Sequence, residues 1–209
     1  MTEIKDKSLH IYLDELASSA PTPGGGSAAA LMGAQAAALT SMVCNLTIGK
    51  PKYAAVETDM QALLQKSEAL RATLTAMIKA DVEVFNQLMA AYGLAKATEQ
   101  EKINRSQQIQ NILKEATQVP LDCAKACAMA IEQSKEAAAK GNLNVISDAG
   151  VAVMSAYAGL KSAALNVYIN TASLKDRDFA EQKLAELNMI LDDMDIKAEE
   201  IYKMVKTKL

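Results

Sequence analysis

The sequence has little that could support histidine, metal or disulfide chemistry. Its 209 residues include one histidine, His10, and three cysteines. A Ser-His-Asp triad would have to use that histidine, and a site with several histidine ligands is excluded. Cys123 and Cys127 lie one helical turn apart, but Cys44 is the only other thiol, so we expect core residues and no metal site. The odd cysteine number fits a reducing compartment, and we expect a cytoplasmic protein.

Aromatic residues make up 4% of the chain and tryptophan is absent. No stretch alternates polar and apolar residues over a convincing length, so we expect no sheet. Half of the residues are hydrophobic, and Ala, Leu, Met, Lys, Glu and Gln dominate, which lose little side-chain freedom in a helix. The composition therefore predicts an all-α protein, folded as a single domain over residues 1–209.

Prolines and glycines divide the chain into about six expected helices. These cover residues 7–18, 27–48, 53–95, 98–140, 144–171 and 176–208, and Pro120 should kink or split the fourth. Thr98 and Glu101 have the spacing of a capping box, which predicts the start of that helix. A helix of about forty residues is about 60 Å long. We therefore predict an elongated up-and-down bundle that forms a homodimer or a higher oligomer.

Charge and hydropathy exclude two classes of partner. The net charge is -3 and the pI is about 5.3, with dispersed Lys and Arg, so we expect no nucleic-acid partner. The N-terminus is charged and lacks the apolar segment of a secretory signal. The most hydrophobic run, residues 28–43, is too short and too weakly apolar for a bilayer, so we expect no membrane partner.

Three consecutive glycines stand in the stretch PTPGGGSAAA, residues 21–30, just before an expected helix. A glycine-rich turn lets a ligand approach the backbone, and the helix dipole favours anionic or electron-rich groups there. The stretch matches neither GxGxxG after a strand nor the end of a P-loop. A ligand cradle and a plain connector both remain open.

The helices expected at 27–48 and 144–171 are apolar nearly all round, which predicts central, buried positions. In the first, Ser27, Ser41 and Asn45 share a face. In the second, polar residues fall within about 40° of one line: Asn144, Asp148, Ser155, Ser162, Asn166 and Asn170.

Two carboxylates need an explanation. A buried group such as Asp148 is costly unless it is paired, and either a structural hydrogen-bond network or a ligand site would pair it. Asp81 lies close to Lys79 and Glu83 in the sequence, so an ordinary solvated face is an equal alternative there.

Three blocks of the sequence resemble the cyclodeaminase/cyclohydrolase family. They run from Leu13 to Tyr53, from Asp81 to Lys96 and from Gly141 to Asn170, and the likeness covers nearly the whole chain. The family includes the C-terminal domain of formiminotransferase-cyclodeaminase and stand-alone bacterial methenyltetrahydrofolate cyclohydrolases. One departure is GLAK at residues 93–96, where many relatives have a proline before the lysine.

The resemblance implies an oligomeric helical enzyme that handles one-carbon units on tetrahydrofolate, with no cofactor beyond that substrate. Its motif positions imply catalytic roles for Asp148, Asp81 and Lys50. The two carboxylates are a pterin anchor and a proton-transfer group in undecided order, and Lys50 is a cationic donor to a developing oxygen or the glutamate tail. The implied substrate-binding residues are Pro23, Gly24, Gly25, Gly26, Ser27, Asn45 and Asn144.

Both acids are expected to meet beside the glycine-rich turn and form one pocket for a reduced pterin. Of the two family activities, we expect hydrolysis of 5,10-methenyltetrahydrofolate to 10-formyltetrahydrofolate, because this chain carries no formiminotransferase domain. The alternatives are a 5-formiminotetrahydrofolate cyclodeaminase that releases ammonia and a non-catalytic helical folate-binding or scaffold protein.

Overall fold

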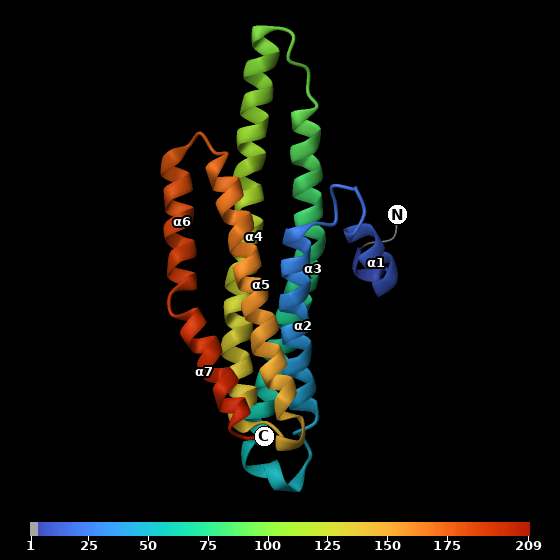
Figure 1. Cartoon of the computed structure of the whole chain (residues 1–209), viewed down its shortest axis with the longest axis vertical. Helices are drawn as coiled ribbons and strands as arrows, with labels where there is room; N and C mark the ends of the chain where they lie inside the picture. The colour runs from blue at the N-terminus through green and yellow to red at the C-terminus, as the bar shows by residue number, and fades with distance from the viewer. Residues whose placement is uncertain (1–3) are drawn as a thin grey trace.

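The computed structural model describes residues 4–209, and in them every regular element is a helix (Figure 1). The all-α prediction is confirmed. The α-helices are α1 (Leu9–Leu16), α2 (Gly25–Asn45), α3 (Glu57–Tyr92), α4 (Glu99–Lys140), α5 (Ile146–Ala172), α6 (Arg177–Leu191) and α7 (Met194–Lys206). Short 3-10 helices lie at η1 (Ile4–Asp6), η2 (Pro51–Val56) and η3 (Leu143–Val145).

Helices α2 to α5 form an elongated up-and-down bundle (Figure 1). The chain descends α2, rises along α3, descends α4 and rises along α5, so α5 runs antiparallel to α2 and α4. Helix α3 has 36 residues and α4 has 42, or about 54 and 63 Å at the usual rise. Their hairpin therefore projects beyond α2, while α6 and α7 cover one side of the bundle and α1 lies on the other.

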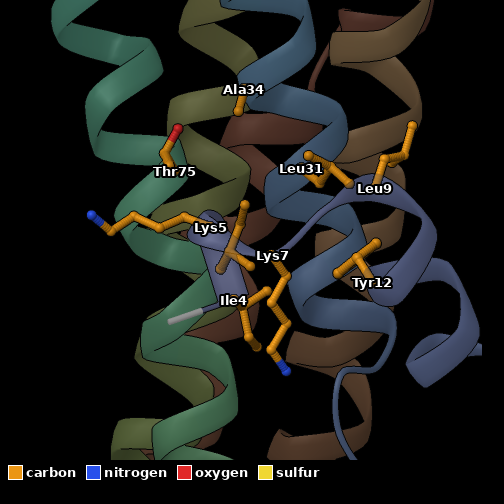
Figure 2. A pocket seen from close by; sticks show the side chains of 9 residues that line it. Ile4, Lys5, Lys7, Leu9, Tyr12, Leu31, Ala34 and Thr75 are labelled. Atoms are coloured by element: carbon orange, nitrogen blue, oxygen red, sulfur yellow. The ribbon is translucent and has the colours of Figure 1, made fainter. Parts of the chain in front are cut away.

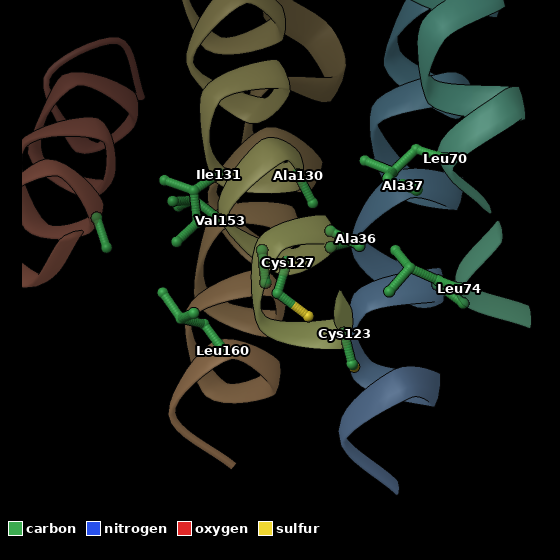
Figure 3. Close-up of a cluster of buried hydrophobic side chains, with 14 of the residues drawn as sticks. Ala36, Ala37, Leu70, Leu74, Cys123, Cys127, Ala130, Ile131, Val153 and Leu160 are labelled. Atoms are coloured by element: carbon green, nitrogen blue, oxygen red, sulfur yellow. The ribbon is translucent and has the colours of Figure 1, made fainter. Parts of the chain in front are cut away.

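Small residues fill the centre of the bundle, where α2, α3, α4 and α5 meet (Figure 3). Cys123 and Cys127 lie in this core as free thiols, as expected. A Cβ atom on Gly33 would come within 2.8 Å of the Cys127 sulfur, and one on Gly159 within 3.0 Å of the Ala29 carbonyl oxygen. Glycine at these two positions lets α2, α4 and α5 pack closely.

Helix α4 runs unbroken through Pro120, although a split was one of the two expected outcomes. Proline lacks the N–H that would bond the carbonyl of Ala116. The side chain of Asn170 on α5 donates to that carbonyl oxygen instead, at 2.5 Å. At the start of α4, the predicted capping box is confirmed, since Glu101 N–H donates to Thr98 Oγ1 and Thr98 N–H donates to the Glu101 carboxylate.

The single helix expected over 176–208 is wrong. The chain breaks between α6 and α7 at Asp192 and Asp193, and Asp193 has a φ of 55°. This left-handed conformation interrupts the helix although the apolar spacing continues across it. Periodicity alone could not reveal a break at a residue that is neither glycine nor proline.

Helices α2 and α5 are less enclosed than expected. Each buries one side in the bundle and leaves an apolar face outside, with 61% and 44% of their most apolar windows buried. Both are long and apolar enough to cross a membrane by length and composition; α2 has 21 residues and a mean hydropathy of 1.4, so the expectation that this region is too short is wrong. Their packing against α3 and α4 is that of core helices.

Candidate functional site

The glycine-rich turn forms the entry to α2. Gly24 caps the helix, and the Ser27 side chain closes the turn by accepting from Gly24 N–H (3.1 Å) and donating to the Gly24 carbonyl oxygen (2.8 Å). Pro23 is buried, and its peptide bond with Thr22 is cis. The turn is therefore a fixed structure, closed by the backbone and one hydroxyl.

Asp81 of α3 reaches this turn. Its carboxylate lies against Gly26, where a Cβ atom would overlap Asp81 Oδ1, and it accepts the backbone N–H of Ser27. Burial raises the pKa of Asp81, and the Ser27 N–H offsets part of that rise because it stabilises the ionised form. The sequence left open the alternative that Asp81 lies on an ordinary solvated face, and this alternative is wrong.

Two further side chains border the turn. Tyr12 of α1 is 5% exposed and lies near Ser27 and Asp81. Asn166 of α5 lies with its side-chain amide 3.8 Å from the position of a Cβ atom on Gly25. We name Pro23, Gly24, Gly25, Gly26, Ser27 and Asp81, together with Tyr12 and Asn166, the glycine-turn cluster.

A second polar cluster lies at the other end of α2, centred on Asn142. The backbone N–H of Asn142 donates to Thr47 Oγ1 (2.9 Å), and its side-chain amide donates to the Leu46 carbonyl oxygen (2.8 Å). Asn142 Oδ1 accepts from the Tyr53 hydroxyl (3.2 Å) and from Asn144 N–H (3.1 Å). These bonds tie the end of α2 to the segment that leads into α5.

The remaining predicted site residues belong to this second end. Asn45 and Lys50 are exposed just before and after the Leu46–Thr47 segment, and Asn144 is exposed in η3. Asp148 is half-buried in the first turn of α5, and its carboxylate makes no hydrogen bond within residues 4–209. We name Asn45, Lys50, Asn142, Asn144 and Asp148 the Asn142-end cluster.

The two clusters are far apart in one chain. Gly25 and Asn45 are the first and last residues of the 21-residue α2, so about 30 Å separates them at about 1.5 Å per residue. Asn166 lies beside Gly25, and Asp148 lies 18 residues earlier on α5, which is about 27 Å. The prediction that Asp81 and Asp148 meet beside the glycine turn is wrong for a single chain.

Half of the predicted polar line on α5 makes side-chain hydrogen bonds within the fold. Ser155 Oγ donates to the Met32 carbonyl oxygen (2.8 Å), Asn166 donates to its own helix at Ser162, and Asn170 donates to Ala116. On α2, Ser41 shares a hydrogen bond of 2.9 Å with Ser67 of α3. A hydrogen-bond network therefore accounts for these residues, while Asp148 stays outside it.

Sequence reasoning missed Tyr12, Tyr53 and Asn142. In α1, Leu9 is 66% exposed and Tyr12 is the buried residue. Asn142 follows a glycine at a helix end, which is a general signal for a loop residue. Only the three-dimensional contacts show that it joins two helices.

Within residues 4–209 there is no group of three or more His, Cys, Asp or Glu side chains that could hold a metal ion. The chemistry available at the glycine-turn cluster is that of a carboxylate, a phenol and backbone N–H groups. Such groups can transfer a proton and donate hydrogen bonds.

Comparisons with known proteins find relatives that match most of the chain. Residues 8–189 match the family model for formiminotransferase-cyclodeaminase. A methenyltetrahydrofolate cyclohydrolase from Methylorubrum extorquens is 58% identical over 204 residues, which covers 98% of each chain. A formimidoyltransferase-cyclodeaminase from Rattus norvegicus is 32% identical over 90% of this chain and 35% of its own length. The crystal structure of a formiminotetrahydrofolate cyclodeaminase from Thermotoga maritima matches with a TM-score of 0.82 at 33% identity, covering 99% of this chain and 98% of that one.

Proposed function

The chain belongs to the formiminotransferase-cyclodeaminase family, and on that premise we propose that it hydrolyses 5,10-methenyltetrahydrofolate to 10-formyltetrahydrofolate. The observation that carries this proposal is the 58% identity to a cyclohydrolase over 98% of both chains. The cyclodeaminase relatives are more distant, at 32% for the rat protein.

The glycine-turn cluster has the groups that this reaction needs. Water adds to a cationic carbon held between two folate nitrogens, so a base must accept a proton as the carbon–oxygen bond forms. Asp81 lies within α3, and its carboxylate, whose pKa is raised by burial, lies against the first turn of α2. We assign it the proton-transfer role and assign Asp148 the role of pterin anchor.

The backbone of the turn offers donors to the same ligand. Ala28 N–H bonds Gly24 and Ser27 N–H bonds Asp81, whereas the N–H groups of Gly25 and Gly26 make no hydrogen bond within residues 4–209. Free N–H groups at a helix start stabilise negative charge on an oxygen. They suit a folate carbonyl or the oxygen that develops during hydrolysis.

The cyclodeaminase activity is the second candidate, favoured by the fold shared with the Thermotoga maritima enzyme. The methenyl form absorbs in the near ultraviolet, so one assay separates the two. A cyclohydrolase makes the absorbance of 5,10-methenyltetrahydrofolate fall above the spontaneous rate. A cyclodeaminase given 5-formiminotetrahydrofolate makes that absorbance rise and releases ammonia. Absence of both changes contradicts the enzymatic proposal and leaves folate binding without turnover.

We also propose that no metal or redox cofactor takes part and that the enzyme works in the cytoplasm without a nucleic-acid or membrane partner. Hydration of an already cationic carbon needs a base and hydrogen-bond donors, which the chain supplies. The full rate should therefore persist after dialysis against a chelator. A rate that falls with chelation and returns with one added metal ion would contradict this.

An apolar face on α2 and α5 supports the proposed homodimer. Its exposed members are Met42, Leu46, Val151, Met154, Leu165 and Ile169. Leu165 and Ile169 are 68% and 67% exposed, which is unusual for adjacent large apolar residues on a monomer surface. We infer that a second copy of the chain covers this face through a two-fold interface.

Such a dimer would also bring the glycine-turn cluster and the Asn142-end cluster together. The two polar clusters lie at opposite ends of α2, with the apolar face between them. A two-fold axis near the middle of that face places the glycine-turn cluster of one copy opposite the Asn142-end cluster of the other. The predicted pocket would then take Asp81 from one subunit and Asp148 from its partner.

A further inference from the structure

The two ends of α2 are held in different ways. Toward its start, the N-terminal segment packs over α2 and α3, with Leu9, Tyr12 and Leu31 around a cavity of about 210 Å³ (Figure 2). At its other end, hydrogen bonds tie the chain to the segment that leads into α5. Hydrogen bonds fix direction as well as distance, so this end can set the orientation of side chains that bind a ligand.

Tyr53 of η2 joins two of these segments. Its backbone N–H donates to the Lys50 carbonyl oxygen at 2.8 Å. Its hydroxyl donates to Asn142 Oδ1 at 3.2 Å and accepts the backbone N–H of Leu143 at 2.9 Å. One residue therefore connects the turn that carries Lys50 to the start of η3, 89 and 90 residues later in the chain.

The Asn142 side chain extends this connection to Asn144. Its Oδ1 atom accepts both the Tyr53 hydroxyl and the Asn144 N–H, and its Nδ2 atom donates to the Leu46 carbonyl oxygen. An amide that accepts on one side and donates on the other has one orientation here. Because Asn142 is 8% exposed, it holds the backbone of Asn144 in place, and Asp148 follows in the first turn of α5.

Stability alone does not account for the Tyr53 hydroxyl. Tyr53 is half-buried, and both Leu143 and Asn144 are exposed, so water can bond their N–H groups if the hydroxyl is removed. Water would satisfy those groups but would not tie η3 to η2. What the hydroxyl adds is a fixed relation between Lys50 and the residues at the start of α5.

We propose that Tyr53 is a positioning residue for substrate binding, whose hydroxyl holds Asn142 and the start of η3 so that Asn144 and Asp148 meet the pterin in a fixed relation to Lys50. This rests on the proposed function, in which Asp148 anchors the pterin. The proton-transfer group, Asp81, belongs to the other cluster, so the hydroxyl supports contacts made equally in the ground state and the transition state. Loss of such contacts raises KM and leaves kcat unchanged.

The test compares Tyr53→Phe with wild type on the full chain. It measures KM and kcat for 5,10-methenyltetrahydrofolate, and the Kd of tetrahydrofolate by calorimetry. Phenylalanine keeps the ring and the backbone N–H that bonds Lys50, so the comparison isolates the hydroxyl. We expect KM and Kd to rise about tenfold, as for the loss of one hydrogen bond, with kcat within about twofold. Tyr92→Phe, the same change at an exposed tyrosine at the far end of α3, should alter none of the three.

A double-mutant cycle shows whether the effect passes through Asn144. Asn144→Ala removes the side chain and keeps the backbone N–H that Asn142 accepts. In this background Tyr53→Phe has less to misplace, so it should weaken tetrahydrofolate binding by a smaller factor. A purely structural hydroxyl would lower the melting temperature and leave Kd and KM unchanged.

The outcomes separate this inference from the proposed function. Unchanged KM and Kd in Tyr53→Phe overturn the inference even if the wild type turns over its substrate, and an equal loss of binding in both backgrounds overturns it as well. If the wild type binds tetrahydrofolate without turnover and Tyr53→Phe weakens that binding, the proposed function fails and the positioning role stands. A wild type that neither binds nor turns over folate contradicts both.

Discussion

Gly26 and Asp81 occupy neighbouring space in the glycine-turn cluster, and the absence of a Cβ atom on Gly26 makes that contact possible. The atom that a Cβ would meet is the end of a side chain, which can rotate away, and not backbone. Glycine here therefore serves the position of the carboxylate more than the stability of α2. Three adjacent glycines suggested a close approach from the sequence, but not that a side chain of α3 makes it.

We predict that Gly26→Ala loses activity while it keeps its fold. The new methyl group displaces the Asp81 carboxylate from the helix start, so we expect a fall in kcat of about a hundredfold or more, as when a catalytic base is misplaced. Alanine is a better helix former than glycine, so the melting temperature should change little. Gly49→Ala is unsuitable as a control because Gly49 has a φ of 73°. Ala28→Gly is the matched control, because it changes the same turn without adding an atom. A Gly26→Ala protein with the wild-type rate would contradict the role of the Asp81 contact.

Asp81→Asn should be inactive yet more stable than wild type at neutral pH. Burial raises the folded-state pKa of Asp81, so between the unfolded and folded pKa values the native state binds more protons. The stability of the wild type therefore falls as pH rises through this window and reaches its lower level above the folded pKa. Asparagine does not ionise, so the variant does not lose stability in this pH window. The gain in melting temperature should be largest at neutral pH and should vanish in acid; a gain independent of pH would contradict the linkage.

At the scale of the elements, a side chain on α5 keeps α4 continuous. Pro120 leaves the Ala116 carbonyl without its usual helical donor, and Asn170 supplies one at 2.5 Å. The sequence placed Asn170 on a polar line that could have been a ligand site. The structure instead shows that a proline and an asparagine 50 residues apart form one structural unit.

Asn170→Leu should therefore lower the free energy of unfolding by about 1–3 kcal/mol, the cost of a buried carbonyl without a donor. Pro120→Ala restores the backbone N–H within α4. In that background, Asn170→Leu should therefore lower the free energy of unfolding by a smaller amount. A double-mutant cycle in urea measures the difference. Equal costs in both backgrounds would mean that the effect of Asn170 comes from packing alone.

The sequence predicted the long helices well because glycines, prolines and a capping box mark their ends. It failed where no residue type marks a break, because Asp193 interrupts a helix although it is neither glycine nor proline. The glycine-rich turn could be predicted because its residues are consecutive in the sequence. Its pairing with Asp81, and its separation from Asp148, depend on contacts between helices that no spacing rule contains.

At the scale of the whole molecule, the division of the predicted site and the exposed apolar face have one common explanation. A single chain carries the glycine-turn cluster at one end of α2 and the Asn142-end cluster at the other, with Leu165, Ile169 and their apolar neighbours left in solvent. The proposed two-fold dimer over this face would bury the apolar residues and would bring the two clusters together. The enzyme would then have two composite sites per dimer, and the monomer would have none.

Leu165→Glu should convert the dimer to a monomer and abolish activity together. A charge that must leave water disfavours the interface by several kcal/mol, whereas in the isolated chain Leu165 is already exposed. Sedimentation at micromolar concentration should show the dimer for wild type and the monomer for the variant, with unchanged helical circular dichroism. Met189→Glu, at a still more exposed site on α6 that lies off this face, is the control and should stay dimeric and active. A monomeric wild type with full activity would remove the composite site.

Mixing two inactive variants tests the composite site directly. Asp81→Asn and Asp148→Asn are each expected to be inactive, because every site in either homodimer lacks one carboxylate. If subunits exchange at random, half of the dimers are mixed, and each mixed dimer has one site with both carboxylates intact. The mixture should then recover about a quarter of the wild-type activity, as two-fold symmetry requires. If both carboxylates instead acted within one chain, every site in every dimer would keep its defect and mixing would restore nothing. Recovery at the rate of subunit exchange, measured by sedimentation of a tagged copy, is the result that only a shared site can give.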